Sequence, residues 1–74
     1  MLYDYSKLQG RIIEKFGTQA GFARAIGRSQ PTVSRKMNGK TGWTQKEMAK
    51  ICDVLDIQDR DISAYFFALK VQRR

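Results

Sequence analysis

The stretch that decides the fold is "TQAGFARAIGRSQPTVSRKMNGK", residues 18–40, which contains two short amphipathic segments on either side of a glycine. Thr18 is a suitable N-cap for the first segment, and Gly27 is suited to end the helix that starts there. The apolar side chains of this segment recur at helical spacing: Phe22, Ala23 and Ile26. The pattern therefore predicts a short helix between Thr18 and Gly27.

The second segment has the same features. Ser29 is a suitable N-cap, Val33 and Met37 are spaced to point inward, and the Asn-Gly pair that follows is typical of a helix end. Pro31 is tolerated in the first turn, where its missing N–H has no partner in the helix. It disfavours helical geometry for Gln30, which favours a start one residue later. Two helices joined by a tight turn with a glycine predict a helix-turn-helix.

Further helices are predicted on both sides of this motif. Residues 5–16 carry apolar side chains at steps of three and four residues, and Gly17 follows as a C-terminal cap. Thr44 and Glu47 have the spacing of a capping box, and the helix that they start has an apolar stripe that includes Cys52. Cys52 is therefore interpreted as a small core residue. The whole chain is predicted to be one all-α domain, a compact bundle of about five short helices.

The C-terminal segment is less regular. A short helix is predicted through about Tyr65, and residues 67–74 are predicted to form an extended or frayed tail. Phe66 and Phe67 are adjacent, so both cannot face one small core from a helix, and one of them is a candidate for contact with another protein. The alternative is that both are partly buried.

The composition limits the function. The chain of 74 residues has a net charge of +7, a single cysteine and no histidine. A disulfide within the chain, a structural zinc site or another metal site, a bound cofactor and an enzymatic mechanism are therefore not expected. With no signal peptide and no apolar run long enough to span a membrane, the expected location is the cytoplasm.

The basic residues are unevenly distributed. Residues 1–50 contain ten Lys and Arg against three acids, whereas residues 51–74 contain four of each. An excess of this kind attracts polyanions such as nucleic acid, although a merely solvated surface is the alternative. Three of the basic residues form a stripe on the first helix that is predicted to have a surface role: Lys7, Arg11 and Lys15. Arg73 and Arg74 are predicted either to attract DNA weakly or to be disordered.

The spacing of several constrained residues resembles the phage repressor and Cro helix-turn-helix family. The match comprises Gln19, Ala23, Gly27, Val33 and the "NGKT" of residues 38–41. The wider chain, with "IIEKFGTQ", "TVSRKMNGK" and "DISAYFF", also resembles small Cro-like or modulator-of-repression proteins from temperate phages of Gram-positive bacteria. This resemblance implies a lambda-repressor-like bundle in a protein of a bacterial host cell.

The resemblance also implies roles for individual residues. The base-reading positions of the family, in the second helix of the motif, correspond to Ser29, Gln30, Pro31, Ser34 and Arg35. Its phosphate-contacting positions correspond to Gln19, Asn38, Lys40 and Thr41. Pro31 departs from the family because it offers no hydrogen bond to a base. Lys36 replaces an apolar anchor, and we expect its ammonium to be free for phosphate or solvent.

Two functions follow from these observations. The first is a Cro-like transcriptional regulator of a lysis/lysogeny switch, which binds double-stranded operator DNA, expected as a homodimer, with the second helix of the motif in the major groove. The alternative is a modulator that binds the phage repressor protein instead of, or as well as, DNA. Its candidate contact surface is either the second helix of the motif or the region of Phe66 and Phe67, and Pro31 in the reading helix favours this alternative.

Overall fold

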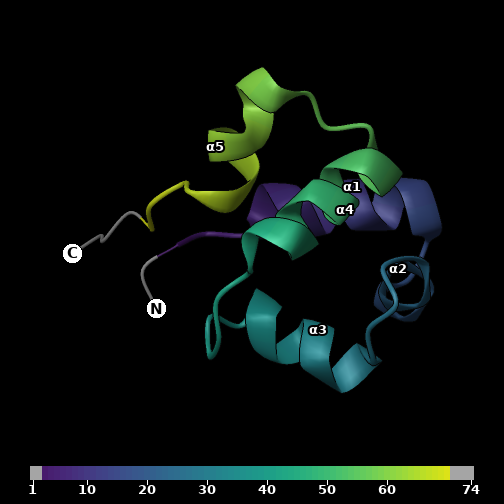
Figure 1. Cartoon of the computed structure of the whole chain (residues 1–74). Helices are drawn as coiled ribbons and strands as arrows, with labels where there is room; N and C mark the ends of the chain where they lie inside the picture. The colour runs from purple at the N-terminus through teal and green to yellow at the C-terminus, as the bar shows by residue number, and fades with distance from the viewer. Residues whose placement is uncertain (1–2, 71–74) are drawn as a thin grey trace.

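The computed structural model describes residues 3–70, so the predictions for Arg73 and Arg74 lie outside the described residues. Within residues 3–70 the chain folds into a compact all-α globule (Figure 1). Its elements in chain order are α1 (Ser6–Phe16), α2 (Gln19–Ala25), α3 (Gln30–Met37), α4 (Gln45–Leu55), the 3₁₀ helix η1 (Asp59–Asp61) and α5 (Ile62–Phe66). The predicted bundle of about five short helices is confirmed. No helix within this range has the length and apolar character needed to cross a membrane.

The capping residues start α2 and α3 where the sequence predicts. The Thr18 hydroxyl accepts a hydrogen bond from the Gly21 backbone N–H, and the Ser29 hydroxyl accepts one from the Thr32 N–H at 3.3 Å. Gly27 lies in the left-handed region with a φ of 73°, a conformation that costs little only for glycine. The prediction that Pro31 delays the start of α3 was wrong, because the helix begins directly after the Ser29 cap.

The hydrophobic core lies where α1, α2, α4 and α5 meet, and α3 is anchored to it by Val33. The largest fully buried side chains come from all five α-helices: Phe22, Phe66, Leu8, Ile12, Ile51, Leu55 and Val33. The predicted inward stripes of α1, α2 and α4 supply most of this core. Figure 1 shows α3 below the other helices, so its outer face is turned away from the core.

Glu47 connects α3 and the turn that precedes it to α4. Its backbone N–H bonds to the Thr44 hydroxyl and its carboxylate accepts from the Thr44 N–H, which together form the predicted capping box. The carboxylate also pairs with Arg28 Nε at 3.0 Å and with Lys36 Nζ at 3.2 Å, and Glu47 is only 6% exposed. Arg28 lies in the turn between α2 and α3, and Lys36 lies on α3, so one carboxylate holds both segments against α4.

The charge of Glu47 is strongly stabilised in this position. Burial alone would raise the pKa of Glu47, but the hydrogen bonds from Thr44, Arg28 and Lys36 outweigh burial and lower the pKa to about 2. A buried carboxylate that has both a cap and two cations is costly to protonate or remove. Glu47 therefore contributes to the orientation of α3 as well as to the start of α4.

The C-terminal segment ends beside the N-terminus. Helix α5 continues to Phe66, one residue beyond the predicted end, and Leu69 then forms an isolated antiparallel bridge with Tyr3. The Asp4 N–H donates to the Ala68 carbonyl at 2.7 Å. The extended conformation predicted after Tyr65 thus starts just after α5, and residues 71–74 of the predicted tail lie outside the described range.

Candidate nucleic-acid and protein interfaces

The outer face of α3 carries the predicted base-reading residues. Gln30, Pro31 and Arg35 are exposed, whereas Ser34 is half-buried. Ser29 is exposed, but its hydroxyl caps α3 and also donates to the Thr32 hydroxyl at 2.9 Å. Since the Ser29 hydroxyl already has two internal partners, the groups most available to a ligand on this face are the Gln30 amide and the Arg35 guanidinium.

Three of the residues predicted to contact DNA lie together in one cleft. Gln19, Ser34 and Asn38 line an opening of about 480 Å³, which we call the polar cleft, together with Asp4. The Asp4 carboxylate accepts hydrogen bonds from the Ser6 hydroxyl and from the Ser6 N–H. Both bonds lower the pKa of Asp4, and the bond from the hydroxyl has the larger effect. The polar cleft therefore contains a carboxylate that would repel a phosphate, although Lys70 also lines it.

The position of Lys36 contradicts one expectation. Its ammonium pairs with Glu47, donates to the Gly42 carbonyl at 2.8 Å and lies 5.7 Å from the centre of the Trp43 ring. The Lys36 side chain is only 12% exposed. The prediction that this ammonium is free for phosphate or solvent was wrong, because a buried carboxylate takes the place of an external anion. Lys40 is exposed in the loop between α3 and α4.

A second candidate interface is apolar and lies near the chain termini. Tyr3, Trp43, Phe66 and Phe67 line a cavity of about 300 Å³, which we call the aromatic cavity, and Thr41 lies at it as well. The Trp43 Nε1 is buried and has no hydrogen-bond partner among the described residues. Tyr5 lines both the aromatic cavity and the polar cleft.

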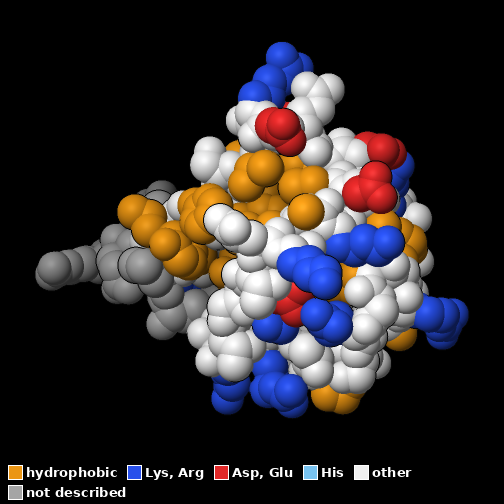
Figure 2. Space-filling model, in the orientation of Figure 1, with side chains coloured by type: hydrophobic (Ala, Val, Ile, Leu, Met, Phe, Trp, Pro, Cys, Tyr) orange, Lys and Arg blue, Asp and Glu red, His pale blue; other side chains and the backbone are white. Residues whose placement is uncertain are grey.

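The two adjacent phenylalanines have different environments. Phe66 is 1% exposed and packs edge-on against Trp43, with ring centres 6.4 Å apart, so of the two candidates for a protein contact it is the buried one. Phe67 is 45% exposed and packs against Tyr3, with ring centres 5.7 Å apart. Leu69 beside it is 61% exposed. Figure 2 shows hydrophobic side chains gathered in a patch on the face in view.

The basic stripe on α1 has internal partners. Arg11 donates through Nε to the Leu55 carbonyl at 2.9 Å, and Lys15 pairs with Asp56 at 2.7 Å. The Lys7 ammonium lies 5.1 Å from the centre of the Tyr65 ring. These contacts attach α1 to the end of α4 and to α5, which agrees with a surface role. Arg11 and Lys15 pair with carboxylates, whereas the contact of Lys7 with an aromatic ring leaves its charge in place.

Sequence reasoning missed Tyr3 as a member of an apolar surface. Tyr3 precedes the first helix and belongs to no periodic pattern, and it reaches the aromatic cavity only because the N-terminal and C-terminal segments pair. Trp43 and Met48, which stand at the N′ and N4 positions of a hydrophobic staple around the Thr44 cap, also line the cavity. The available signal was the high aromatic content close to both ends of the sequence.

Comparisons with known proteins agree with the all-α fold. The profile of the family described as "Protein of unknown function (DUF739)" matches residues 1–69. Among solved structures, the chain is similar to the solution structure of the modulator of repression (MOR) of the temperate bacteriophage TP901-1 from Lactococcus lactis. The two sequences are 50% identical, the match covers 97% of each chain, and the TM-score is 0.81. No curated protein matches the chain.

Proposed function

The chain belongs to the DUF739 family, and we propose that it is a phage modulator of repression, a binding protein without enzymatic activity that acts on the phage repressor. The observation that carries this proposal is the similarity to the TP901-1 modulator of repression over nearly the whole of both chains. The place of action would be the cytoplasm of the bacterial host, where a repressor and its operators are found.

The apolar surface supports a protein partner. A small monomer rarely leaves several large apolar side chains exposed side by side, and protein interfaces are enriched in aromatic residues near their centre. Phe67 and Leu69 are exposed next to the aromatic cavity, and none of the described residues in the cavity lining is charged. We therefore assign the repressor contact to the aromatic cavity and to Phe67 in particular.

The outer face of α3 supports DNA binding less well. Lys36 is held internally by Glu47, Pro31 offers no hydrogen bond, and Asp4 lies in the cleft where a phosphate would be expected. Phosphate contacts supply much of the affinity of a DNA-binding protein. A surface with few cations available for phosphates is therefore less suited to DNA than to a protein partner.

A direct test uses the repressor encoded by the same phage. The chain and the repressor should elute together in size-exclusion chromatography at micromolar concentration, and calorimetry should give the affinity. Phe67→Ala should weaken binding by about tenfold or more, because a few aromatic anchors usually supply most of the binding energy of an interface. Ile13→Ala is the matched control, since Ile13 is 44% exposed but lies on α1.

Two results would count against the proposal. If the repressor elutes alone in the presence of the wild-type chain, the partner is wrong. If Ile13→Ala weakens binding as much as Phe67→Ala, the repressor is bound but the contact surface is misassigned. Thermal unfolding of both variants shows whether each still folds.

Operator binding remains a second candidate, because Gln30 and Arg35 are exposed on α3 and Lys40 is exposed in the following loop. In this case a homodimer would read paired half-sites. Arg35→Ala would relax base preference, whereas Lys40→Ala would weaken binding to all sequences about equally. A gel shift with specific and random duplexes tests both variants, and equal losses on both duplexes for both variants would contradict the assigned roles.

A further inference from the structure

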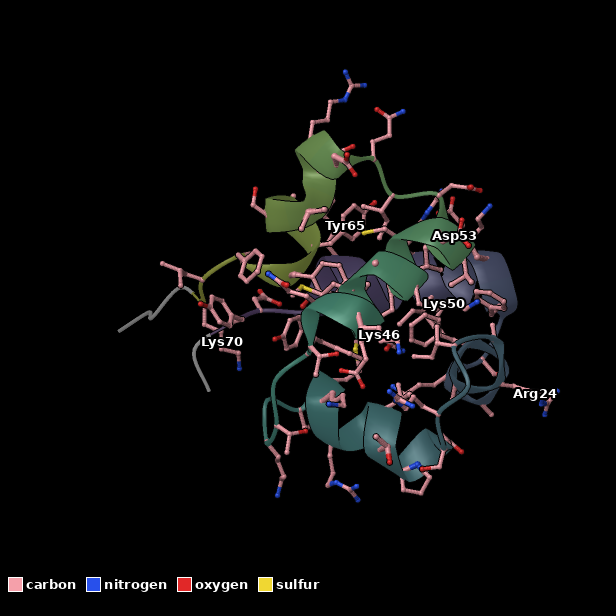
Figure 3. The ribbon with its side chains drawn as sticks, in the orientation of Figure 1. Arg24, Lys46, Lys50, Asp53, Tyr65 and Lys70 are labelled. Atoms are coloured by element: carbon pink, nitrogen blue, oxygen red, sulfur yellow. The ribbon has the colours of Figure 1, made fainter. Side chains whose placement is uncertain are left out.

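A cleft along α4 is lined by basic side chains that have no role in the proposed function so far. Arg28, Lys46 and Lys50 line an opening of about 500 Å³ together with Glu47 and Asp53, and we call it the basic cleft. Within residues 3–70, neither Lys46 nor Lys50 forms an ion pair with a carboxylate. Figure 3 shows both lysines on α4, and Figure 2 shows blue side chains gathered on this face.

The buried Glu47 side chain orients one of the cations in this cleft. Its carboxylate binds Arg28 through Nε, which orients the guanidinium and leaves its two terminal nitrogens for other partners. Glu47 is almost fully buried, whereas the Arg28 side chain is 46% exposed. The accessible charge of the cleft is therefore mostly positive, with Asp53 as the one exposed carboxylate in its lining.

The helical period places the basic cleft next to an apolar surface. Lys46, Lys50 and Asp53 follow one another at steps of four and three residues and so share one face of α4. Met48 and Cys52 lie on the neighbouring face, where they line a groove of about 430 Å³ that we call the apolar groove. Its lining also includes Ala49, Ile62 and Phe67, together with the polar residues Gln45 and Asp59. Ala49 lines both openings, so α4 is a ridge with cations on one side and apolar groups on the other.

We infer that the basic cleft is the charged rim of the partner-binding surface and that it receives carboxylate side chains of the repressor, while the apolar groove beside it receives apolar side chains. This inference rests on the proposed function, because Phe67 belongs both to the apolar groove and to the aromatic cavity. An apolar centre with a polar, solvent-accessible rim is the usual composition of a protein interface.

The same observations favour a protein over a nucleic acid as the occupant. A phosphate backbone along α4 would pass Asp53, which repels it, and would leave the apolar groove without a partner. A protein surface can offer acids to Lys46 and Lys50 and a base to Asp53. Rim charges of this kind act mainly on the rate of association and on its salt dependence.

The experiment measures association of the chain with the repressor of the same phage by stopped-flow fluorescence, at low and high salt. Lys46→Gln and Lys50→Gln should each lower the association rate by about threefold at low salt, because they weaken electrostatic steering. At about 1 M salt, where screening acts within about 3 Å, both rates should approach that of the wild type. Arg24→Gln is the matched control, since Arg24 is exposed on α2 and points away from α4 in Figure 3.

The outcomes separate this inference from the proposed function. If the wild-type chain binds the repressor but Lys46→Gln and Lys50→Gln behave like Arg24→Gln, the inference is overturned and the proposed function stands. If both lysine variants lose affinity for a random DNA duplex and not for the repressor, the cleft faces phosphates and the inference is also overturned. If the wild-type chain forms no complex with the repressor, both fall together. Circular dichroism of each variant confirms that the helices are retained.

Discussion

Removal of the Glu47 charge tests how α3 is held against α4. Glu47→Gln keeps the size and shape of the side chain but leaves Arg28 and Lys36 without their shared carboxylate. The pKa of Glu47 falls from 4.5 to about 2 on folding. Each pKa unit corresponds to about 1.4 kcal/mol, so the ionised carboxylate contributes up to about 3 kcal/mol to the free energy of unfolding at neutral pH.

Screening by solvent reduces this contribution to the free energy of unfolding. The Arg28 side chain is 46% exposed, and exposed ion pairs are weakened by screening, so we expect a loss of about 2 to 3 kcal/mol for Glu47→Gln at pH 7. A small domain has roughly 0.05 to 0.15 kcal/mol of stability per residue, which makes this loss a large fraction of the total. The melting temperature should fall by about 10 to 20 °C.

The pH dependence has a definite sign. Since folding lowers the pKa of Glu47, its stabilisation is fully present above pH 4.5 and is lost as the pH falls toward about 2. The difference in unfolding free energy between the wild type and Glu47→Gln should therefore shrink across this range. Asp4 and Asp56 also have lowered pKa values, Asp4 through its bonds with Ser6 and Asp56 through its bond with Lys15, but both are present in the two proteins and cancel in the comparison.

The assay is urea unfolding followed by circular dichroism at pH 7, 4.5 and 2.5. Glu14→Gln is the control, because Glu14 pairs with Arg11 on the exposed surface of α1 and its loss should have a much smaller effect. The reasoning is refuted if Glu47→Gln is as stable as the wild type at pH 7, or if the difference between them stays constant as the pH is lowered.

Three further predictions concern local features. Ser29→Ala removes the cap of α3 and should cost about 1 kcal/mol in urea unfolding, whereas no change would mean that the cap is not needed. Phe66→Ala should cost about 3 to 5 kcal/mol because it empties a fully buried site, and Phe67→Ala should cost much less; equal losses in thermal unfolding would contradict their assigned environments. Burial raises the pKa of the Cys52 thiol, so a chromogenic disulfide reagent at pH 8 should react more slowly with the folded protein than with the urea-unfolded chain, and equal rates would show that the thiol is accessible.

The fold could be predicted where local signals act alone. The caps at Thr18, Ser29 and Thr44 depend on one hydroxyl and a backbone N–H three residues later, so the sequence contains all the necessary information. The apolar stripe of α4 likewise predicts which residues are inward. These local features were sufficient to identify the bundle and the order of its helices.

The candidate interfaces depend on contacts between distant segments. Lys36 looked free because its partner, Glu47, was already assigned to a capping box, and no local rule shows that one carboxylate serves both roles. The choice between Phe66 and Phe67 depends on the exact phase of a helix of five residues, which is too short to show a period. Tyr3 joins the apolar surface only through its pairing with Leu69.

The most direct test of the proposed function is a gel shift with the operator DNA of the same phage, its repressor and this chain. We predict that the repressor alone shifts the DNA, that this chain alone does not, and that a stoichiometric amount of the chain changes the repressor's shift. A strong shift by the chain alone, weakened by salt, with no effect on the repressor's shift, would contradict the account and support the Cro-like alternative.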